Sequence, residues 1–143
     1  MNLSYEERLS ETLPQVHVRI AEATDASGRE SDTVRLVAVT KAHPLDAVAA
    51  ALAAGLTDLG ENRIEELEEK VGALGRDSAP WHMIGHLQSR KARRASELAH
   101  LIQSVDSARL GARISRFAEE EEITVRILAQ VNTSGEPSKS GFD

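Results

Sequence analysis

The feature that most constrains the fold of this chain is a regular alternation of short apolar segments with helical patterns. Strands are predicted to begin at about residues 35, 57, 81, 100 and 124, so the pattern repeats roughly every 19 to 24 residues. One strand followed by one helix has this length, and such units build parallel sheets that helices cover. We therefore expect an α/β fold.

The predicted strands are short, and apolar residues at helical spacing follow most of them. We expect strands at residues 35–41, 57–60, 81–85, 101–104 and 124–132, with the last the longest. A first helix begins with a Ser4–Glu7 capping box and extends to about Ala26, with a kink or a break at Pro14. Asn62 is expected to cap the helix after the second strand.

Two architectures fit such consecutive units: an open doubly wound sheet and a (β/α)8 barrel. No G-x-G-x-x-G motif follows the first strand, which disfavours a dinucleotide-binding open sheet. Five strands are too few to close a barrel of eight, and the chain ends soon after the fifth strand, at Ser-Gly-Phe-Asp. We therefore expect residues 1–143 to form a single domain, the N-terminal portion of a longer barrel.

The composition disfavours several classes of protein. The 143 residues are 41% hydrophobic, and no apolar run approaches the roughly 18 residues that a membrane span requires. The absence of cysteine excludes disulfides and thiolate metal sites. With 17 Lys and Arg against 23 Asp and Glu, the net charge of −6 disfavours nucleic acid and membrane lipid as partners. The acidic, polar start does not have the pattern of a secretory signal, so we expect a cytoplasmic protein.

Polar residues gather at the predicted carboxyl ends of the strands, where α/β proteins bind ligands. They are Lys41, Glu61, Asn62, His86, Ser104, Asp106 and Asn132. Strand alternation places Lys41 in one row with Val37 and Val39, so partial desolvation is expected to favour its neutral amine. A neutral lysine can attack an aldehyde to form a Schiff base. The alternative is a lysine that extends into solvent at the edge of the sheet.

Two further patterns are given structural roles. His82 and His86 are four residues apart, and in a strand this spacing is about 13 Å, so we expect no shared metal ion. The basic run Ser89–Arg94 is expected to be the solvated face of a helix, because the chain as a whole is acidic.

Four segments carry a family resemblance, namely AVTKAHP, DLGENRIEE, WHMIGHLQSRK and QVNTSGEPSKSGF, in this order. With them the chain resembles the pyridoxal-phosphate homeostasis protein family, single-domain relatives of the alanine racemase barrel. The resemblance implies a TIM-type (β/α) barrel of the alanine racemase N-terminal kind, with about five βα units of eight. It implies that Lys41 holds pyridoxal 5'-phosphate as a Schiff base. The other cofactor-site residues that it implies are Asn62, His82, Ile84, His86, Asn132 and Lys139.

The same resemblance implies a function in pyridoxal-phosphate homeostasis, in which the protein buffers the cofactor or delivers it to dependent apoenzymes without established catalysis. Racemization in the two-domain relatives uses a second acid or base from an added β domain. The expected assembly is a monomer or a weak homodimer.

This chain departs from its relatives in two respects. His43 stands where many of them have a second lysine, which leaves the role of that position open. The relatives also continue for three more strands, and the groups that hold the phosphate come from that part. The resemblance therefore implies a much reduced affinity for the cofactor in this chain alone, or a partner that completes the barrel.

Two other functions remain open from the residues alone. One is a Schiff-base racemase or lyase, in which Lys41 acts with His86 or His82 as the proton carrier. The other is an interaction module, in which the open edge of an incomplete sheet pairs with another chain, and Ser89–Arg94 binds an acidic partner or RNA.

Overall fold

The computed structural model describes residues 3–143. Its strands are β1 (Val37–Val39), β2 (Asp58–Glu61), β3 (Trp81–Met83), β4 (Leu101–Val105) and β5 (Ile127–Ala129). Its α-helices are α1 (Tyr5–Ala26), α2 (Leu45–Ala53), α3 (Ile64–Leu74), α4 (Ala92–Leu98) and α5 (Ala108–Glu120). Three short 3-10 helices join them: η1 (Ser31–Thr33), η2 (Arg76–Ser78) and η3 (Ser89–Lys91).

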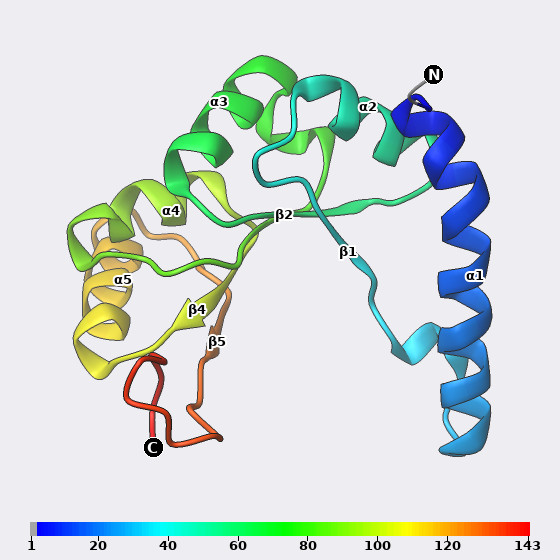
Figure 1. Cartoon of the computed structure of the whole chain (residues 1–143). Helices are drawn as coiled ribbons and strands as arrows, with labels where there is room; N and C mark the ends of the chain where they lie inside the picture. Colours follow the sequence, from blue (N-terminus) through cyan, green and yellow to red (C-terminus); the bar gives the residue numbers. More distant parts are fainter. Residues whose placement is uncertain (1–2) are drawn as a thin grey trace.

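The five strands form one sheet in the order β1-β2-β3-β4-β5, and all four neighbouring pairs are parallel. Each strand thus pairs with the next one along the chain, as in a (β/α) barrel, whereas a doubly wound sheet reverses its order at a switch point. The expected α/β fold, with five consecutive units of the barrel type, is confirmed. Figure 1 shows the sheet as an arch, with α2, α3, α4 and α5 along its outer side.

The first helix is continuous at Pro14, where the sequence predicted either a kink or a break. Ser4 caps α1 through the expected capping box with Glu7, and the helix continues through Pro14 to Ala26. The chain then turns at Gly28, whose φ of +68° favours glycine. None of the helices within residues 3–143, including the long α1, has the length and apolarity needed to cross a bilayer.

Three local predictions were wrong. Strand β1 ends at Val39, so Lys41 lies in the turn that follows the strand. Strand β5 covers only residues 127–129 of the expected 124–132, because a register shift between Ile102 and Val105 interrupts its pairing with β4, and β4 is the longest strand. The N-cap of α3 is Arg63, without a side-chain cap bond, because the helix begins one residue later than expected and Asn62 lies in the bend between β2 and that cap.

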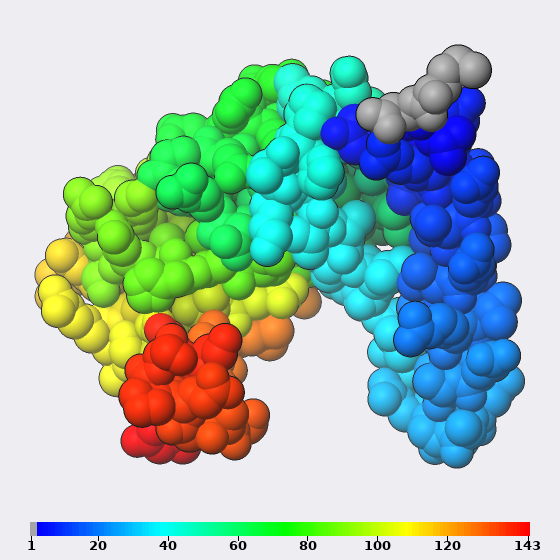
Figure 2. All heavy atoms as spheres, in the orientation of Figure 1, coloured from blue at the N-terminus to red at the C-terminus, as the bar shows by residue number. Residues whose placement is uncertain are grey.

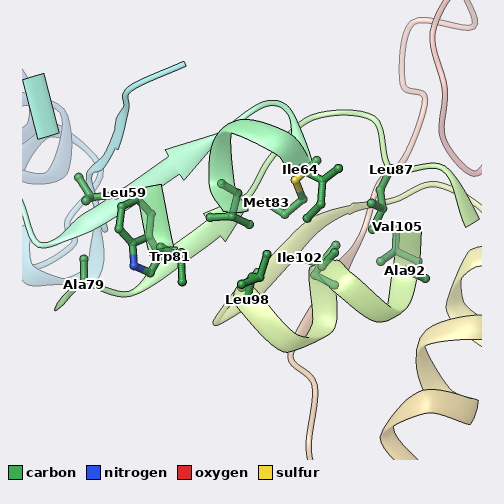
Figure 3. Close-up of a cluster of buried hydrophobic side chains, with 14 of the residues drawn as sticks. Leu59, Ile64, Ala79, Trp81, Met83, Leu87, Ala92, Leu98, Ile102 and Val105 are labelled. Carbon is green, nitrogen blue, oxygen red and sulfur yellow. The ribbon is translucent and has the colours of Figure 1, made fainter. Parts of the chain in front are cut away.

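The hydrophobic core lies between the sheet and the outer helices, as Figure 3 shows. Alternation sends every second residue of β2, β3 and β4 into it, and Leu59, Trp81 and Ile102 of these strands are fully buried there, whereas the residues of β5 are exposed. The facing helices contribute side chains at helical spacing, among them Ile64, Leu67, Val71, Ala95, Leu98, Leu110 and Ile114. This packing orders the central strands and therefore the loops at their carboxyl ends.

The opposite, concave face of the sheet is open at its two edge strands, β1 and β5, whereas Asp58 and His82 of the central strands are buried. Val39 is 45% exposed and Leu128 is 50% exposed, although both are large apolar side chains on strands. Figure 2 shows a hollow on this side, between α1 in blue and the C-terminal segment in orange and red. Side chains at these two edges of the concave face are therefore accessible to a ligand or to another polypeptide.

Candidate functional site

Lys41 follows a row of β1 side chains on the concave face. Ala38 packs against the core and Thr40 is buried, so the intervening residues point to the other side of the sheet. A Cβ atom on Gly60 would lie 3.1 Å from Val37 Cγ1 and 3.3 Å from Ile84 Cδ1, which places Val37 and Ile84 together on that face. The predicted alternation therefore holds from Val37 to Thr40, and Lys41 follows it at the start of the turn.

A tight turn carries Lys41. The His43 N–H donates to the Thr40 carbonyl at 3.1 Å, which closes a four-residue turn with Lys41 and Ala42 at its centre. Ala42 has a φ of +59°, a conformation that a type II turn requires at this position and that favours glycine. Lys41 itself is exposed, and no hydrogen bond or ion pair of its ammonium group occurs within residues 3–143.

The expected desolvation of Lys41 was therefore wrong for the described part of the chain. The concave face is open beside β1, and water reaches the end of the Val37 to Lys41 row. The sequence correctly placed the lysine at the end of an apolar row, but the row is not covered. The Lys41 amine is accessible for reaction with a small electrophile from the concave side.

A buried ion pair lies directly behind the Lys41 turn. Lys70 of α3 donates from Nζ to Glu61 Oε1 and to the Thr40 carbonyl, at 2.7 Å in each case. The Thr40 hydroxyl donates to the same Glu61 oxygen. All three residues are buried, with exposed fractions of 0% for Glu61, 4% for Lys70 and 5% for Thr40. Nearby, Glu66 Oε2 accepts a hydrogen bond from the Ala42 N–H at 2.6 Å.

Sequence reasoning placed Glu61 at the rim but missed Lys70 and the pair. The pattern that could have found it is a charged residue on an apolar face. Lys70 follows Leu67 by three residues and so shares the buried side of α3, while Glu61 shares its side of β2 with Leu59. Two opposite charges predicted to be buried on adjacent elements indicate an ion pair.

Asn62 and His86 lie at the carboxyl ends of β2 and β3 and are both exposed. His86 Nδ1 is 3.2 Å from Asp106 Oδ2, on the loop after β4. Asn62 and His86 line a cavity of about 390 Å³, together with Glu66, Met83, Leu87 and Gln88 among others. The structure thus brings these two predicted site residues together, and Glu66 connects the cavity to the Lys41 turn through the Ala42 hydrogen bond.

Gly85 makes the close approach of β2 and β3 possible at this end of the sheet. A Cβ atom there would lie 2.0 Å from the Asn62 carbonyl oxygen and 2.5 Å from Asn62 Oδ1, so no other residue fits without movement of the backbone. The Gly85 carbonyl in turn accepts a hydrogen bond from the buried Ser104 hydroxyl at 2.6 Å. The glycine of the WHMIGHLQ segment is therefore required for packing at the rim.

His82 does not reach the rim. It is 1% exposed, its Nε2 donates to Asp58 Oδ1 at 2.9 Å, and its Nδ1 accepts from the Gln103 amide at 2.8 Å. Arg35 lies 3.5 Å from the same Asp58 oxygen. His82 thus belongs to a hydrogen-bonded layer across β2, β3 and β4, beneath Ile84 and the rim. Within residues 3–143 no cluster of three or more potential metal ligands is present.

Asn132 and Lys139 occupy the loop after β5, which Asn132 organises. The Asn132 N–H donates to the Phe142 carbonyl at 2.7 Å, and its Oδ1 accepts from the Gly135 N–H at 3.2 Å. Its Nδ2 is 3.4 Å from the Lys139 carbonyl, and the Lys139 side chain is exposed. This loop lies at the far end of the sheet from β1, so the structure keeps this pair apart from Lys41.

The basic run is largely neutralised by acidic residues of neighbouring helices. Lys91 pairs with Glu65, Arg94 pairs with Glu68 at 2.6 Å, and Arg93 pairs with Glu121 at 2.5 Å. The hydrogen bond from Lys91 lowers the pKa of Glu65, and the carboxylates of Glu97 and Glu68 raise the pKa of Arg94. These pairs connect α3 to η3 and α4, and α4 to the C-cap of α5, as a solvated helix face does.

Comparisons with known proteins agree on one family. The family model described as "Alanine racemase, N-terminal domain" matches residues 18–143. The "Pyridoxal phosphate homeostasis protein" of Pseudomonas aeruginosa is 41% identical over 133 residues, which is 93% of this chain and 58% of that protein. The protein of the same description from Escherichia coli K12 is 35% identical over 137 residues.

Solved structures show the same fold. The crystal structure of an unknown protein from Bifidobacterium adolescentis is similar with a TM-score of 0.88 and 38% identity, over 100% of this chain and 62% of that one. PipY of Synechococcus elongatus, in a structure with PLP bound, has a TM-score of 0.73 and 37% identity, over 87% of this chain and 58% of that one. The present chain therefore spans less than two thirds of the length of these relatives.

Proposed function

We propose that this chain, which belongs to the alanine racemase N-terminal domain family, binds pyridoxal 5'-phosphate through Lys41 and acts in the homeostasis of that cofactor. The observation that carries the proposal is the position of Lys41, an accessible amine that follows the first strand of a barrel-type sheet on its concave face. Ligands of barrel enzymes bind at this end of the strands.

The residues around the Lys41 turn fit the aldehyde end of the cofactor. Pyridoxal phosphate supplies an aldehyde with which a lysine amine condenses reversibly. The amine of Lys41 is accessible on the concave face, and polar side chains follow the next two strands, in Asn62 and His86. We assign only this end of the cofactor to the described residues.

The other predicted site residues would lie at different distances from the cofactor. Ile84 lies on the concave face beside Gly60 and would form an apolar wall. His82 would support the floor from its buried layer and would not contact the cofactor directly. Asn132 would order the loop after β5, from which Lys139 would approach the cofactor entrance.

A carrier role, with delivery to apoenzymes that depend on the cofactor, accounts best for this arrangement. The description of the curated relatives as homeostasis proteins and the accessibility of Lys41 support it. An exposed amine exchanges its bound aldehyde with competing amines and water more readily than an enclosed one, as a buffer or donor of the cofactor requires.

The proposal is tested by reductive trapping. The full chain is incubated with pyridoxal 5'-phosphate, reduced with borohydride and digested, and the labelled lysine is identified by mass spectrometry. We expect the label at Lys41, its loss in Lys41→Arg, and normal labelling in the control Lys91→Arg, whose lysine pairs with Glu65 outside the turn. Label distributed over several lysines in proportion to their exposure would refute the assignment.

A second assay separates a carrier from an enzyme. The loaded protein is incubated with a panel of amino acids, and racemization and product release are measured against Lys41→Arg. A carrier shows no turnover, but it transfers the cofactor to an apoenzyme whose recovered activity is recorded.

A further inference from the structure

We propose that Glu61, Lys70 and Glu66 are positioning residues that hold the main chain on both sides of Lys41, so that its amine stays on the concave face. The inference rests on the proposed function of Lys41. It concerns three side chains that make no contact with the Lys41 amine and act through its neighbours in the chain.

The residue before Lys41 is held at every polar group. The Thr40 N–H donates to the Gly60 carbonyl at 3.1 Å, which continues the β1–β2 pairing one residue beyond the strand. The Thr40 carbonyl accepts from Lys70 Nζ at 2.7 Å, and its hydroxyl donates to the Glu61 carboxylate. Hydrogen bonds that involve a charged partner are the stronger ones, and here they lie in a buried site where water does not compete.

The residue after Lys41 is held by a second carboxylate. The Ala42 N–H donates to Glu66 Oε2 at 2.6 Å, and hydrogen bonds to a carboxylate are shorter and stronger than those between neutral groups. Ala42 has a φ of +59°, which is unfavourable for alanine, so the bond to Glu66 stabilises a backbone conformation that alanine would not otherwise prefer. The next residue is also held, because His43 Nδ1 lies 3.2 Å from the Tyr5 hydroxyl of α1.

Burial does not account for the Glu66 bond. Ala42 is exposed and Glu66 is only partly buried, so water could satisfy both groups. Instead, three charged side chains from β2 and α3 converge on one four-residue turn, and the reactive group that this turn presents is Lys41. A fixed direction of approach for the amine raises its rate of reaction with a bound aldehyde.

The test uses Glu66, because its replacement leaves the buried pair intact. Glu66→Ala removes the bond to Ala42, Glu66→Gln keeps an acceptor oxygen, and Glu69→Ala removes a matched glutamate from an exposed position of α3. For each full-length variant, two quantities are measured: hydrogen exchange of the Ala42 amide without cofactor, and the rate at which pyridoxal 5'-phosphate labels Lys41 before borohydride reduction.

We expect Glu66→Ala to accelerate hydrogen exchange of the Ala42 amide, because the turn is less ordered. We expect it to slow Lys41 labelling by about tenfold, the factor that one charged hydrogen bond accounts for. Glu66→Gln should recover most of the labelling rate, and Glu69→Ala should match the wild type. Equal labelling of Lys41 in wild type and Glu66→Ala would overturn the positioning role alone. An unlabelled Lys41 in the wild type would overturn the proposed function, and the positioning role with it.

Discussion

Replacement of Lys70 by methionine tests how the buried pair behind the Lys41 turn contributes to stability. Lys70 Nζ makes both of its hydrogen bonds to buried acceptors, and Glu61 is 0% exposed. Methionine fills the volume of the lysine stem but leaves the Glu61 carboxylate with only the Thr40 hydroxyl as a donor. The other carboxylate oxygen, Glu61 Oε2, already lacks a hydrogen-bond partner within the described residues. Removal of one partner from a buried ion pair costs about 3–5 kcal/mol.

The Thr40 carbonyl adds little to this loss, because it also accepts from the His43 N–H at 3.1 Å. In the double variant Lys70→Met/Glu61→Gln the buried charge is gone and an acceptor for the Thr40 hydroxyl remains. Only imperfectly satisfied neutral groups are then left, at about 1–3 kcal/mol. The double variant should therefore be about 2 kcal/mol more stable than Lys70→Met alone.

Urea unfolding followed by circular dichroism measures these differences. With a slope of about 2 kcal/mol per molar urea, Lys70→Met should lower the midpoint by roughly 2 M, and the double variant should recover about 1 M. Lys91→Met is the matched control, because Lys91 pairs with an exposed Glu65 and such pairs contribute about 0–1 kcal/mol. The reasoning is refuted if Lys70→Met changes stability no more than Lys91→Met, or if the double variant is the least stable.

Three further outcomes follow from single positions. Burial lowers the pKa of His100 below its ordinary value of 6.5, so on acidification the unfolded chain binds the proton first. The free energy of unfolding should therefore fall as the pH drops through 6.5 toward the folded-state pKa. Unfolding midpoints at several pH values should show this fall, and His100→Gln should reduce it. Ala42→Gly should raise the free energy of unfolding by about 0.5–1 kcal/mol, since glycine tolerates a φ of +59°, and a loss of stability would contradict the turn geometry. Gly85→Ala should cost about 3 kcal/mol in the same assay, because its Cβ would lie 2.0 Å from the Asn62 carbonyl; a stable variant would mean that the two strand ends separate easily.

Much of the fold could be predicted because its determinants are local. The strand and helix repeat is a property of consecutive residues, and it indicated parallel βα units and the positions of α1, α2 and α5. Strand lengths could not be predicted so well, because the extent of a strand depends on its partners. The segment after Glu122 has a long apolar pattern, but β5 pairs with β4 alone and extends over three residues.

Only part of the candidate site could likewise be predicted from local sequence. Lys41, Asn62 and His86 could be placed at the rim because each follows a recognisable strand. His82 has the same residue type and lies in the same segment as His86, yet it is buried in a hydrogen-bonded layer with Asp58. The difference arises from the position along the chain, because His82 lies within β3 between two neighbouring strands, whereas His86 lies beyond the end of β3.

The sequence by itself determined that this chain builds consecutive parallel βα units and that an amine follows the first strand, because periodicity and motif order are written in neighbouring residues. Only the tertiary structure decided that the amine is exposed on an open concave face and that Glu61, Lys70 and Glu66 hold the turn around it. The physical reason is that burial and ion pairing depend on contacts between β2, α3 and the turn after β1. These segments meet only when the chain folds, so their charges acquire partners that no local pattern specifies.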